Sequence, residues 1–315
     1  MAKNAKLVIA SDASMIKGIP VSADAKLVCY CHSPPRYIWE MPEAYSNKNS
    51  GMGLFARTIF RLAIPFCKWF DRRSAKRVDL FIANSSFVAS RIERYYCTPS
   101  IVVYPPVSYE EFDFDRPRKE FFLMVSELVP YKRVDIAVHA FNKNGLPLVI
   151  IGDGTERKRL EALAGPNIQF LGRQPFDVLR DHYQTCRAFI FPGLEDFGIT
   201  PLEAQAAGAP VIAFGSGGPL ETVIAGKTGI FFDTQTADSL NEAIADLNSL
   251  PYWQQDTLAL TCRRNAEAFG ADRFRREIVA AISTVVDSID DFIPQYPTIE
   301  TSAENKAHKS EVVTK

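Results

Sequence analysis

The segment between residues 191 and 221 concentrates polar side chains and glycines in a pattern that suits ligand binding. Glu195 follows a short apolar run typical of a strand, and a carboxylate in such a loop can accept hydrogen bonds from hydroxyl groups, such as those of a sugar. Thr200-Pro201 predicts the start of a helix with proline at its first position. The backbone amides of residues 197–199 would then face the ligand side of the sheet and could bind an anion.

Glu203 admits two interpretations. Thr200 and Glu203 have the spacing of a capping box, in which the carboxylate only satisfies a backbone amide at the helix start, and on these residues alone we expect the cap. The alternative is a ligand-binding carboxylate. The glycines of 215–218 predict a second tight turn before a helix, where the backbone can approach a ligand closely.

Residues 29–32 contain a candidate functional side chain and a candidate metal site. His32 follows a predicted strand and precedes two prolines, in a loop that we expect to face a cleft, so we interpret it as functional. Cys29 and Cys31 have a one-residue spacing with no second ligand pair, so we expect no metal. The six cysteines are interpreted as small buried hydrophobic residues.

Short apolar runs alternate with stretches of helical period, which is typical of parallel sheets crossed by helices. Ten strands are predicted: Leu7–Ala10, Leu27–Cys31, Leu80–Ala83, Ile101–Tyr104, Phe121–Val125, Leu148–Ile151, Ile168–Leu171, Ala188–Phe191, Val211–Ala213 and Ile230–Phe232. We expect domains over 1–106 and 121–270 joined by a linker at 107–120, a helix over 271–291 that returns toward the first domain, and a disordered tail over 292–315. A ligand would bind between the two sheets.

The composition excludes several classes of protein. The 315 residues suffice for two domains, and 36 basic against 37 acidic side chains give a net charge of −1, so we expect no nucleic-acid partner. The apolar run at Leu7–Ala10 is too short for the core of a signal peptide, so we expect a cytoplasmic protein.

Several ordered motifs extend over about residues 6–285. The second half contains Glu195-x7-Glu203 with Phe197-Gly198, Ala207-Gly-Ala-Pro-Val-Ile, Gly217-Gly-Pro-Leu-Glu221, Thr228-Gly, Val129-Pro-Tyr-Lys132-Arg-Val-Asp135, Gly152-Asp-Gly154 and Phe170-Leu-Gly-Arg173. The first half contains Cys29-Tyr-Cys-His32-Ser-Pro-Pro-Arg36-Tyr, Ile82-Ala-Asn84-Ser85 and Val103-Tyr-Pro-Pro-Val107. Together they resemble the retaining family-4 glycosyltransferases of GT-B fold, in particular the mannosyltransferases of surface polysaccharide and O-antigen assembly.

The resemblance implies a role for each matching residue. Glu195 would bind donor-sugar hydroxyls beside the anomeric carbon, Lys132 would neutralise the diphosphate, and His32 would contact the sugar from the facing domain. Glu203 would bind the ribose hydroxyls. The other donor-binding positions are Phe197, Gly198, Ile199, Gly152, Gly154, Arg173, Gln174, Arg133, Gly217 and Gly218. No metal or cofactor is needed if Lys132 and helix dipoles stabilise the leaving diphosphate.

The resemblance therefore implies an α/β protein of two Rossmann-like domains that transfers a hexose with retention. The expected donor is GDP-mannose, and the expected acceptor is a glycan or lipid-linked molecule in surface polysaccharide synthesis. The alternative is a protein that binds a sugar nucleotide without turnover, either a pseudoenzyme or a truncated gene product.

Two departures from the family pattern favour the alternative. Relatives have an arginine five residues before the lysine, where this chain has Glu127, so either Glu127 turns away from the diphosphate or Arg133 supplies part of the charge. Relatives also begin with roughly two or three further βα units. We therefore expect a truncated N-terminal domain, low activity, and an exposed sheet edge at which the chain pairs with a partner or itself.

Residues 54–77 predict a long helix, interrupted only by Pro65, with a strong basic character. Arg57, Arg61, Lys68 and Arg72 share one face. We expect a core helix with a solvated basic face. The alternative is an amphipathic helix that docks on anionic lipid at the inner face of the membrane, beside a lipid-linked acceptor.

Overall fold

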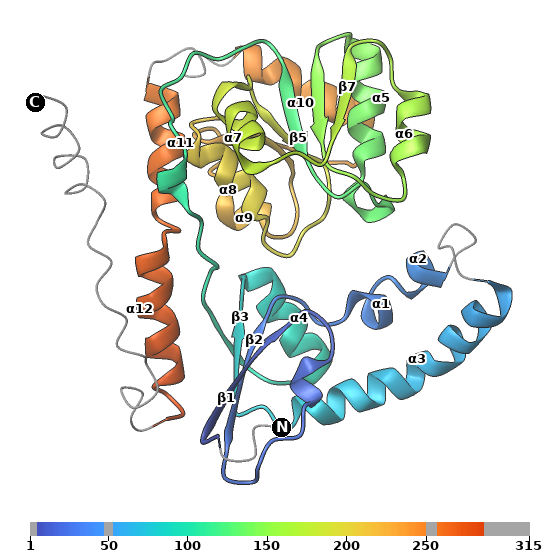
Figure 1. Ribbon diagram of the computed structural model, residues 1–315, viewed down its shortest axis with the longest axis vertical. Coiled ribbons are helices and arrows are strands. Elements are labelled where there is room, and N and C mark those ends of the chain that lie inside the picture. The colour runs from blue at the N-terminus through green and yellow to red at the C-terminus, as the bar shows by residue number, and fades with distance from the viewer. Residues whose placement is uncertain (1–4, 47–52, 250–256, 287–315) are drawn as a thin grey trace, which may run out of the picture.

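The structure is a computed structural model that describes residues 5–46, 53–249 and 257–286. These residues form two α/β domains, one above the other in Figure 1, connected on one side by an extended segment and by a helix that lies beside the lower domain. The expected tail at 292–315 lies outside the described residues, as do the last residues of the expected 271–291 helix.

The N-terminal domain contains a parallel sheet of four strands within the described residues, in the order β1-β2-β3-β4. The strands are β1 (Leu7–Asp12), β2 (Lys26–Cys31), β3 (Leu80–Ala83) and β4 (Ser100–Val102). The helices are α1 (Arg36–Trp39), α2 (Pro42–Ser46) and α3 (Leu54–Ala75), all between β2 and β3, and α4 (Ser86–Tyr96) after β3. Ser85 is the N-cap of α4, because its hydroxyl accepts a hydrogen bond from the Val88 amide.

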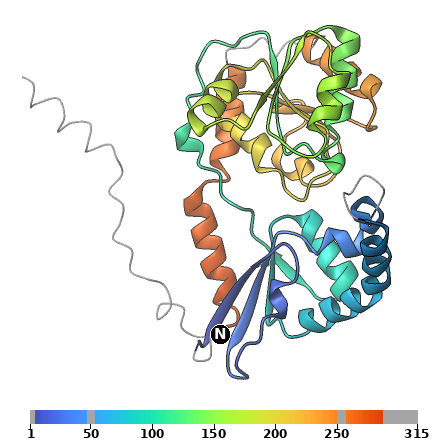
Figure 2. The same ribbon diagram turned by 45° about the vertical axis from the view of Figure 1, so that its right-hand side comes forward.

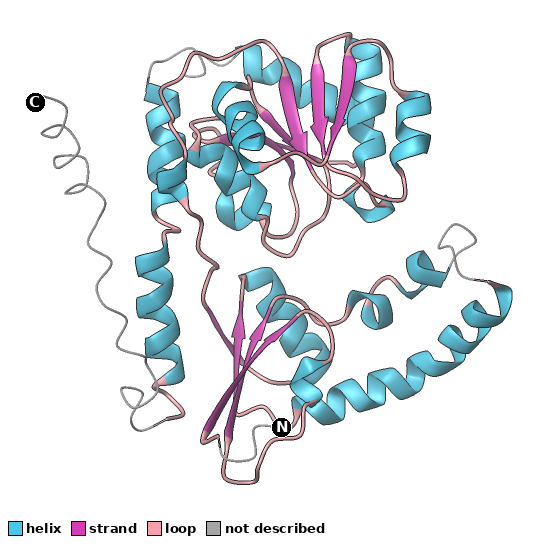
Figure 3. Cartoon of the chain, in the orientation of Figure 1, coloured by secondary structure: helices cyan, strands magenta, loops and turns pink. Residues whose placement is uncertain are grey.

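The C-terminal domain contains a parallel sheet of six strands in the described chain, in the order β10-β9-β8-β5-β6-β7. The strands are β5 (Phe122–Val125), β6 (Leu148–Ile151), β7 (Ile168–Gly172), β8 (Phe189–Phe191), β9 (Val211–Phe214) and β10 (Gly229–Phe232). The helices are α5 (Val134–Asn144), α6 (Arg157–Leu163), α7 (Phe176–Thr185), α8 (Ile199–Ala206), α9 (Pro219–Thr222), α10 (Ala237–Ser249) and α11 (Thr257–Glu267). They cover both faces of the sheet (Figure 3).

The predicted α/β fold with two parallel sheets is confirmed. All ten predicted strands are present, and their ends shift by no more than two residues. Strands such as β6 and β8 are buried along their whole length, because helices lie on both faces of a parallel sheet. β6, which follows β5 in the chain, pairs with one side of β5, whereas β8 pairs with the other side. The winding of the sheet therefore reverses between β5 and β8.

Two segments cross between the domains, as Figure 2 shows from a second angle. In the extended segment, the Val107 amide donates to the Phe269 carbonyl at 3.0 Å. The second segment is α12 (Ala271–Ile282), where Arg273 donates to the Tyr104 carbonyl at 2.8 Å. The far end of α12 buries Ala281 and Ile282 in a cluster with residues of β2 and β3. The helix that follows the C-terminal domain therefore packs on the N-terminal sheet.

β1 forms one edge of the N-terminal sheet, and among the described strands only β2 pairs with it. Ile9, in the middle of β1, is 53% exposed. An exposed strand edge with an apolar side chain is a site at which another strand can pair. The expected association through this edge stays a prediction.

The expectation that the helix at 54–77 is a core helix is wrong. Its apolar side chains face solvent, with Phe55 80%, Leu62 76% and Phe66 65% exposed. In Figure 1, α3 extends away from the sheet rather than lying across it, and only its last turns contribute to the core. Within the described residues, no helix is long and apolar enough to cross a membrane.

The interpretation of the cysteines is wrong at two positions. Cys29, Cys31, Cys186 and Cys262 are buried, whereas Cys97 is exposed and Cys67 is half-buried. Cys97 is exposed because it ends α4 at the surface, in a left-handed conformation with φ of 54°.

Candidate functional site

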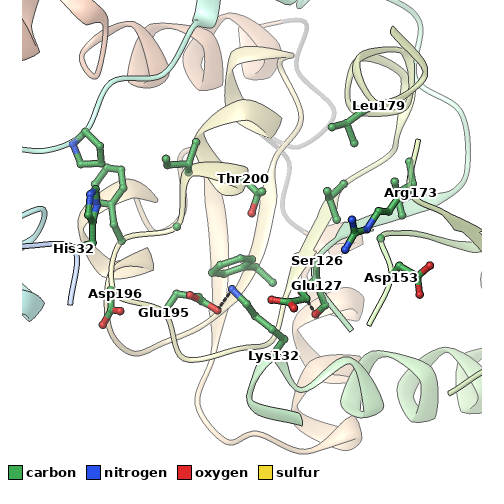
Figure 4. A pocket seen from close by; sticks show the side chains of 18 of the residues that line it. His32, Ser126, Glu127, Lys132, Asp153, Arg173, Leu179, Glu195, Asp196 and Thr200 are labelled. Atoms are coloured by element: carbon green, nitrogen blue, oxygen red, sulfur yellow. Dashed lines mark hydrogen bonds and ion pairs between the residues drawn. The ribbon is translucent and has the colours of Figure 1, made fainter. Parts of the chain in front are cut away.

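A cavity of about 740 Å³ opens between the domains, at the carboxyl ends of strands from both sheets. The N-terminal domain contributes His32, Asn84 and Pro105 to its lining. The C-terminal domain contributes the loops that follow β5, β6, β7 and β8 (Figure 4). These loops flank the point where the winding of the sheet reverses, which is where sheets of this type bind ligands.

Lys132 and Glu195 form an ion pair in this cavity. Lys132 ends a 3₁₀ turn (Pro130–Lys132) after β5, and Glu195 lies in the loop between β8 and α8. The Lys132 Nζ lies 2.5 Å from the Glu195 Oε1, drawn as a dashed line in Figure 4. The structure therefore brings together a cation suited to a diphosphate and a carboxylate suited to hydroxyl groups, from loops 63 residues apart in the chain (195 − 132).

The start of α8 faces the same cavity through Phe197, Gly198, Ile199 and Thr200. The prediction that the helix begins at Thr200 is wrong. It begins at Ile199, and Gly198 is its N-cap with a φ of +87°, a conformation that glycine adopts without strain. No side chain caps this end, so its first backbone amides can bind an anion. The Phe197 ring is buried and stacks on Tyr104, which holds the loop in place.

Glu203 does not form the capping box expected on the residues alone, because Thr200 lies inside α8 rather than at its cap. The Tyr183 hydroxyl donates to the Glu203 Oε2 at 2.8 Å instead. Burial raises the pKa of the Glu203 carboxyl, and the hydrogen bond from Tyr183 partly opposes the rise. Glu203 lies one turn beyond the residues that line the cavity.

Four glycines with expected roles in donor binding let neighbouring loops touch. A Cβ atom on Gly154 would lie 2.4 Å from the Leu128 carbonyl oxygen, and one on Gly218 would lie 2.3 Å from the Phe197 Cα. Gly152 and Gly217 approach the backbone of Ser126 and Glu195 in the same way. Gly152 lines the cavity, whereas the other three support loops that do.

The charged residues expected near the diphosphate lie in different places. Arg173 and Gln174 line the cavity beside β7. Arg133 lies outside the lining and pairs with Asp135 at 3.2 Å. Glu127 lines the cavity, so this carboxylate does not turn away from it.

His32 reaches the cavity from the N-terminal domain, at the end of β2. Its Nε2 lies 2.8 Å from the Ser11 Oγ, and its ring packs edge-on against Tyr30. Burial lowers the pKa of His32, although the charges of Asp12 and Asp196 oppose this shift. A neutral imidazole is therefore favoured.

Asp196 is a functional candidate that the sequence does not reveal. Its side chain forms ion pairs with Arg36 and Arg91 of the N-terminal domain. The signal in the sequence was weak. Asp196 directly follows Glu195, and Arg36 lies four residues after His32 in a motif quoted for the resemblance, but no local pattern pairs them.

Three comparisons place the chain among known proteins. The family model "Glycosyl transferases group 1" matches residues 110–268. An uncharacterized glycosyltransferase of Methanocaldococcus jannaschii is 27% identical over 233 residues, which cover 71% of this chain and 64% of the relative. The GDP-mannose-dependent alpha-(1-6)-phosphatidylinositol monomannoside mannosyltransferase of Mycobacterium tuberculosis is 31% identical over 217 residues, covering 58% of this chain and 56% of the relative.

The sucrose-phosphate synthase of Thermosynechococcus elongatus has a similar fold, with a TM-score of 0.70 at 19% identity. The match covers 89% of this chain and 73% of that structure. The chain spans less than two thirds of the length of the two curated relatives. The matched family model covers 159 residues, counted from 110 to 268, which is half of the chain and includes the Lys132–Glu195 pair. The chain therefore belongs to the group 1 glycosyltransferases, with a GT-B fold.

Proposed function

We propose that the cavity between the domains binds a nucleotide sugar and that the chain transfers its hexose to an acceptor with retention of anomeric configuration. One observation carries the proposal, the Lys132–Glu195 pair beside the uncapped start of α8. The pair and the helix start supply the two features that glycosyl transfer from a diphosphate requires, stabilisation of the leaving group and recognition of sugar hydroxyls.

In the proposed reaction, the bond between the anomeric carbon and the diphosphate oxygen breaks as the acceptor oxygen forms a bond to that carbon on the same face, and the proton of the acceptor hydroxyl passes to the departing diphosphate. The Lys132 ammonium and the amides of residues 197–199 balance the charge that develops on the departing diphosphate. Glu195 accepts hydrogen bonds from donor-sugar hydroxyls, and Glu203 accepts them from the ribose. His32 contacts the sugar from the opposite domain.

The proposed donor is GDP-mannose, and the proposed acceptor is a glycan or lipid-linked molecule in surface polysaccharide synthesis. Support for the donor comes from the mycobacterial relative, whose name specifies GDP-mannose. A second candidate is binding without turnover. It is favoured by Glu127, because a carboxylate in the cavity opposes the additional negative charge that develops on a departing diphosphate.

The test is incubation of the chain with GDP-mannose and a glycan or lipid-linked acceptor, followed by mass spectrometry for released GDP and by NMR of the glycoside product. We expect GDP release and an α-anomeric product, with UDP-glucose as the comparison donor. Saturable binding of GDP-mannose with no release would support the second candidate. Absence of binding to both donors would contradict the proposal.

We also propose that α3 is a site of peripheral contact with an anionic membrane, where a lipid-linked acceptor resides. The helix exposes Leu54, Phe55, Leu62 and Phe66 along its first part. Its last part forms a groove lined by Pro65, Lys68, Trp69, Arg72, Arg73 and Lys76. Exposed apolar side chains can enter the interface of a bilayer, while the basic groove attracts acidic headgroups.

Vesicle sedimentation tests the membrane contact. We expect the chain to sediment with vesicles of phosphatidylglycerol and phosphatidylcholine but not with phosphatidylcholine alone. The charge-reversed variant Arg73→Glu/Lys76→Glu and the variant Phe55→Ser should each bind several-fold less. Lys158→Glu/Lys227→Glu, which alters exposed bases of the C-terminal domain, is the matched control. Equal binding by all variants would contradict the contact.

A further inference from the structure

Asp196 connects the two domains through groups on both its side chain and its backbone. Its Oδ2 lies 2.9 Å from the Arg36 guanidinium, and its Oδ1 accepts from Arg91. The Ser85 hydroxyl donates to its carbonyl at 2.6 Å. Arg36, Ser85 and Arg91 all belong to the N-terminal domain, whereas Asp196 lies in the loop between β8 and α8 of the other domain.

The charges at this contact are complementary, and the two arginine side chains are largely excluded from solvent. Arg91 is 4% exposed and Arg36 is 11% exposed. Within the N-terminal domain, Arg91 also pairs with Glu40 at 2.5 Å. Two cations and one anion leave this domain with one uncompensated positive charge, which the Asp196 carboxylate balances. A buried charge without a partner is costly, so the contact favours the arrangement in which the domains meet.

Arg36 contacts both loops that carry the Lys132–Glu195 pair. Its guanidinium pairs with Asp196, the residue after Glu195. The same group lies over the ring of Tyr131, the residue before Lys132, at 5.7 Å from the ring centre. Arg36 also lies four residues after His32, as the first residue of α1, directly after the loop that brings the imidazole to the cavity. One side chain therefore joins the three segments on which the proposed chemistry depends.

We propose that Arg36 and Asp196 are positioning residues for the transfer reaction: their ion pair sets the placement of His32 relative to the Lys132–Glu195 pair. The inference rests on the proposed function. Neither side chain needs to touch the donor. Asp196 lines the cavity between Glu195 and the amides of residues 197–199, but its carboxylate pairs with the two arginines of the N-terminal domain. We therefore expect the pair to act on turnover more than on nucleotide affinity.

The direct test compares Asp196→Asn and Arg36→Met with the unchanged chain, using GDP-mannose as donor. We expect kcat for GDP release to fall about 10- to 100-fold, because small misplacements of catalytic groups have effects of this size. The dissociation constant for GDP, measured by calorimetry, should stay within about twofold. A parallel fall in GDP affinity, or an unchanged kcat, would overturn the proposal.

Two further variants separate positioning from general damage to the fold. Asp196→Glu keeps the charge and should recover most of the lost kcat, and Arg36→Met/Asp196→Asn should be no slower than the slower single variant. Asp238→Asn is the matched control, because Asp238 forms an exposed ion pair with Lys143 within the C-terminal domain. Additive losses in the double variant would overturn the proposal.

Small-angle X-ray scattering tests the inference independently of activity. It applies even if the chain releases no GDP from any donor, which is the result that would refute transfer. We expect Asp196→Asn to increase the radius of gyration relative to both the unchanged chain and Asp238→Asn, because the domains lose their shared charge contact. Identical scattering from all three proteins would overturn the positioning role without bearing on the proposed function.

Discussion

At the scale of single residues, the cavity shows which charges are available to a ligand. Glu195 is paired with Lys132, Asp153 with Arg157 at 3.2 Å, and Asp196 with Arg36 and Arg91. A diphosphate that enters would compete with Glu195 for Lys132 and would meet Arg173 at the cavity wall. In the proposed reaction, stabilisation of the leaving group would therefore depend most on Lys132.

The first prediction concerns this cation. Lys132→Met should lower kcat for GDP release from GDP-mannose by about 10²- to 10³-fold, the loss typical when one group that stabilises transition-state charge is removed. The control is Lys143→Met, which breaks an exposed ion pair on the far end of α5. Steady-state kinetics with equal rates for Lys132→Met and Lys143→Met would contradict the role of Lys132.

The second prediction concerns the pH dependence of stability at Glu203. Burial raises the pKa of this carboxyl above its ordinary value of 4.5, so the folded protein holds a proton there more readily than the unfolded chain does. Its ionisation therefore costs folding free energy, and the cost grows as the pH rises from 4.5 through the raised pKa. Glu203→Gln keeps an oxygen that accepts from Tyr183 and removes the ionisation.

We expect Glu203→Gln to have a larger free energy of unfolding than the unchanged chain at pH 7.5, and the difference to shrink near pH 4. Denaturant titrations at the two pH values measure it. A difference that is the same at both values, or that grows in acid, would contradict the raised pKa.

At this scale, the sequence predicts residues whose role follows from local position. Lys132, Glu195 and His32 follow strands that are recognisable as apolar runs, and the structure brings all three to one cavity. Asp196, Arg36 and Arg91 could not be predicted, because their partners are 105 to 160 residues away (196 − 91 and 196 − 36) and depend on how the domains meet. The capping box failed because Gly198, and not Thr200, takes the cap position.

At the scale of elements, the loops at the carboxyl ends of the C-terminal strands support one another. The Gly218 amide donates to the Glu195 carbonyl at 2.9 Å, and the Leu128 amide donates to the Asp153 carbonyl at 3.0 Å. The glycine turns matter because side chains there would separate these loops. The sequence pattern of these glycines predicts contact with a ligand. In the structure, Gly154, Gly217 and Gly218 pack instead against the backbone of neighbouring loops.

The third prediction follows from this packing. In Gly218→Ala the new Cβ would lie 2.3 Å from the Phe197 Cα, so the loop that carries Glu195 must move. We expect a loss of about 1–3 kcal/mol in the free energy of unfolding, the usual cost of overpacking, together with weaker GDP binding. Gly53→Ala is the control, because both glycines have a φ near −60° and nothing lies within 4 Å of a Cβ on Gly53. Equal stability of the two variants would contradict the packing role.

Strands such as β6 and β8 were predictable because they are buried along their whole length and form short apolar runs bounded by polar turns. The position of α3 outside the core was not predictable, because an amphipathic pattern shows that one face is apolar but does not show what covers that face. Figure 1 shows α3 leaving the sheet, and Phe55 and Phe66 remain exposed. The pattern correctly predicts a helix and incorrectly predicts that the helix lies in a core.

At the scale of the whole molecule, two domains enclose a cavity and meet through few, strongly charged contacts. Asp196 pairs with two arginines, and the Glu221 carboxylate accepts from the Ser86 and Phe87 amides at the start of α4. The linker and α12 connect the domains on one side. In the proposed function, this arrangement would let the C-terminal domain bind a nucleotide while the contact with the N-terminal domain places His32.

The central claim is that this cavity binds a nucleotide sugar through Lys132. Calorimetric titration of GDP-mannose into the unchanged chain and into Lys132→Met tests it most directly. We expect saturable binding of one molecule per chain, weakened at least tenfold in the variant, which corresponds to about 1.4 kcal/mol of binding free energy. Equal affinity of the two proteins, or no binding by the unchanged chain, would contradict it.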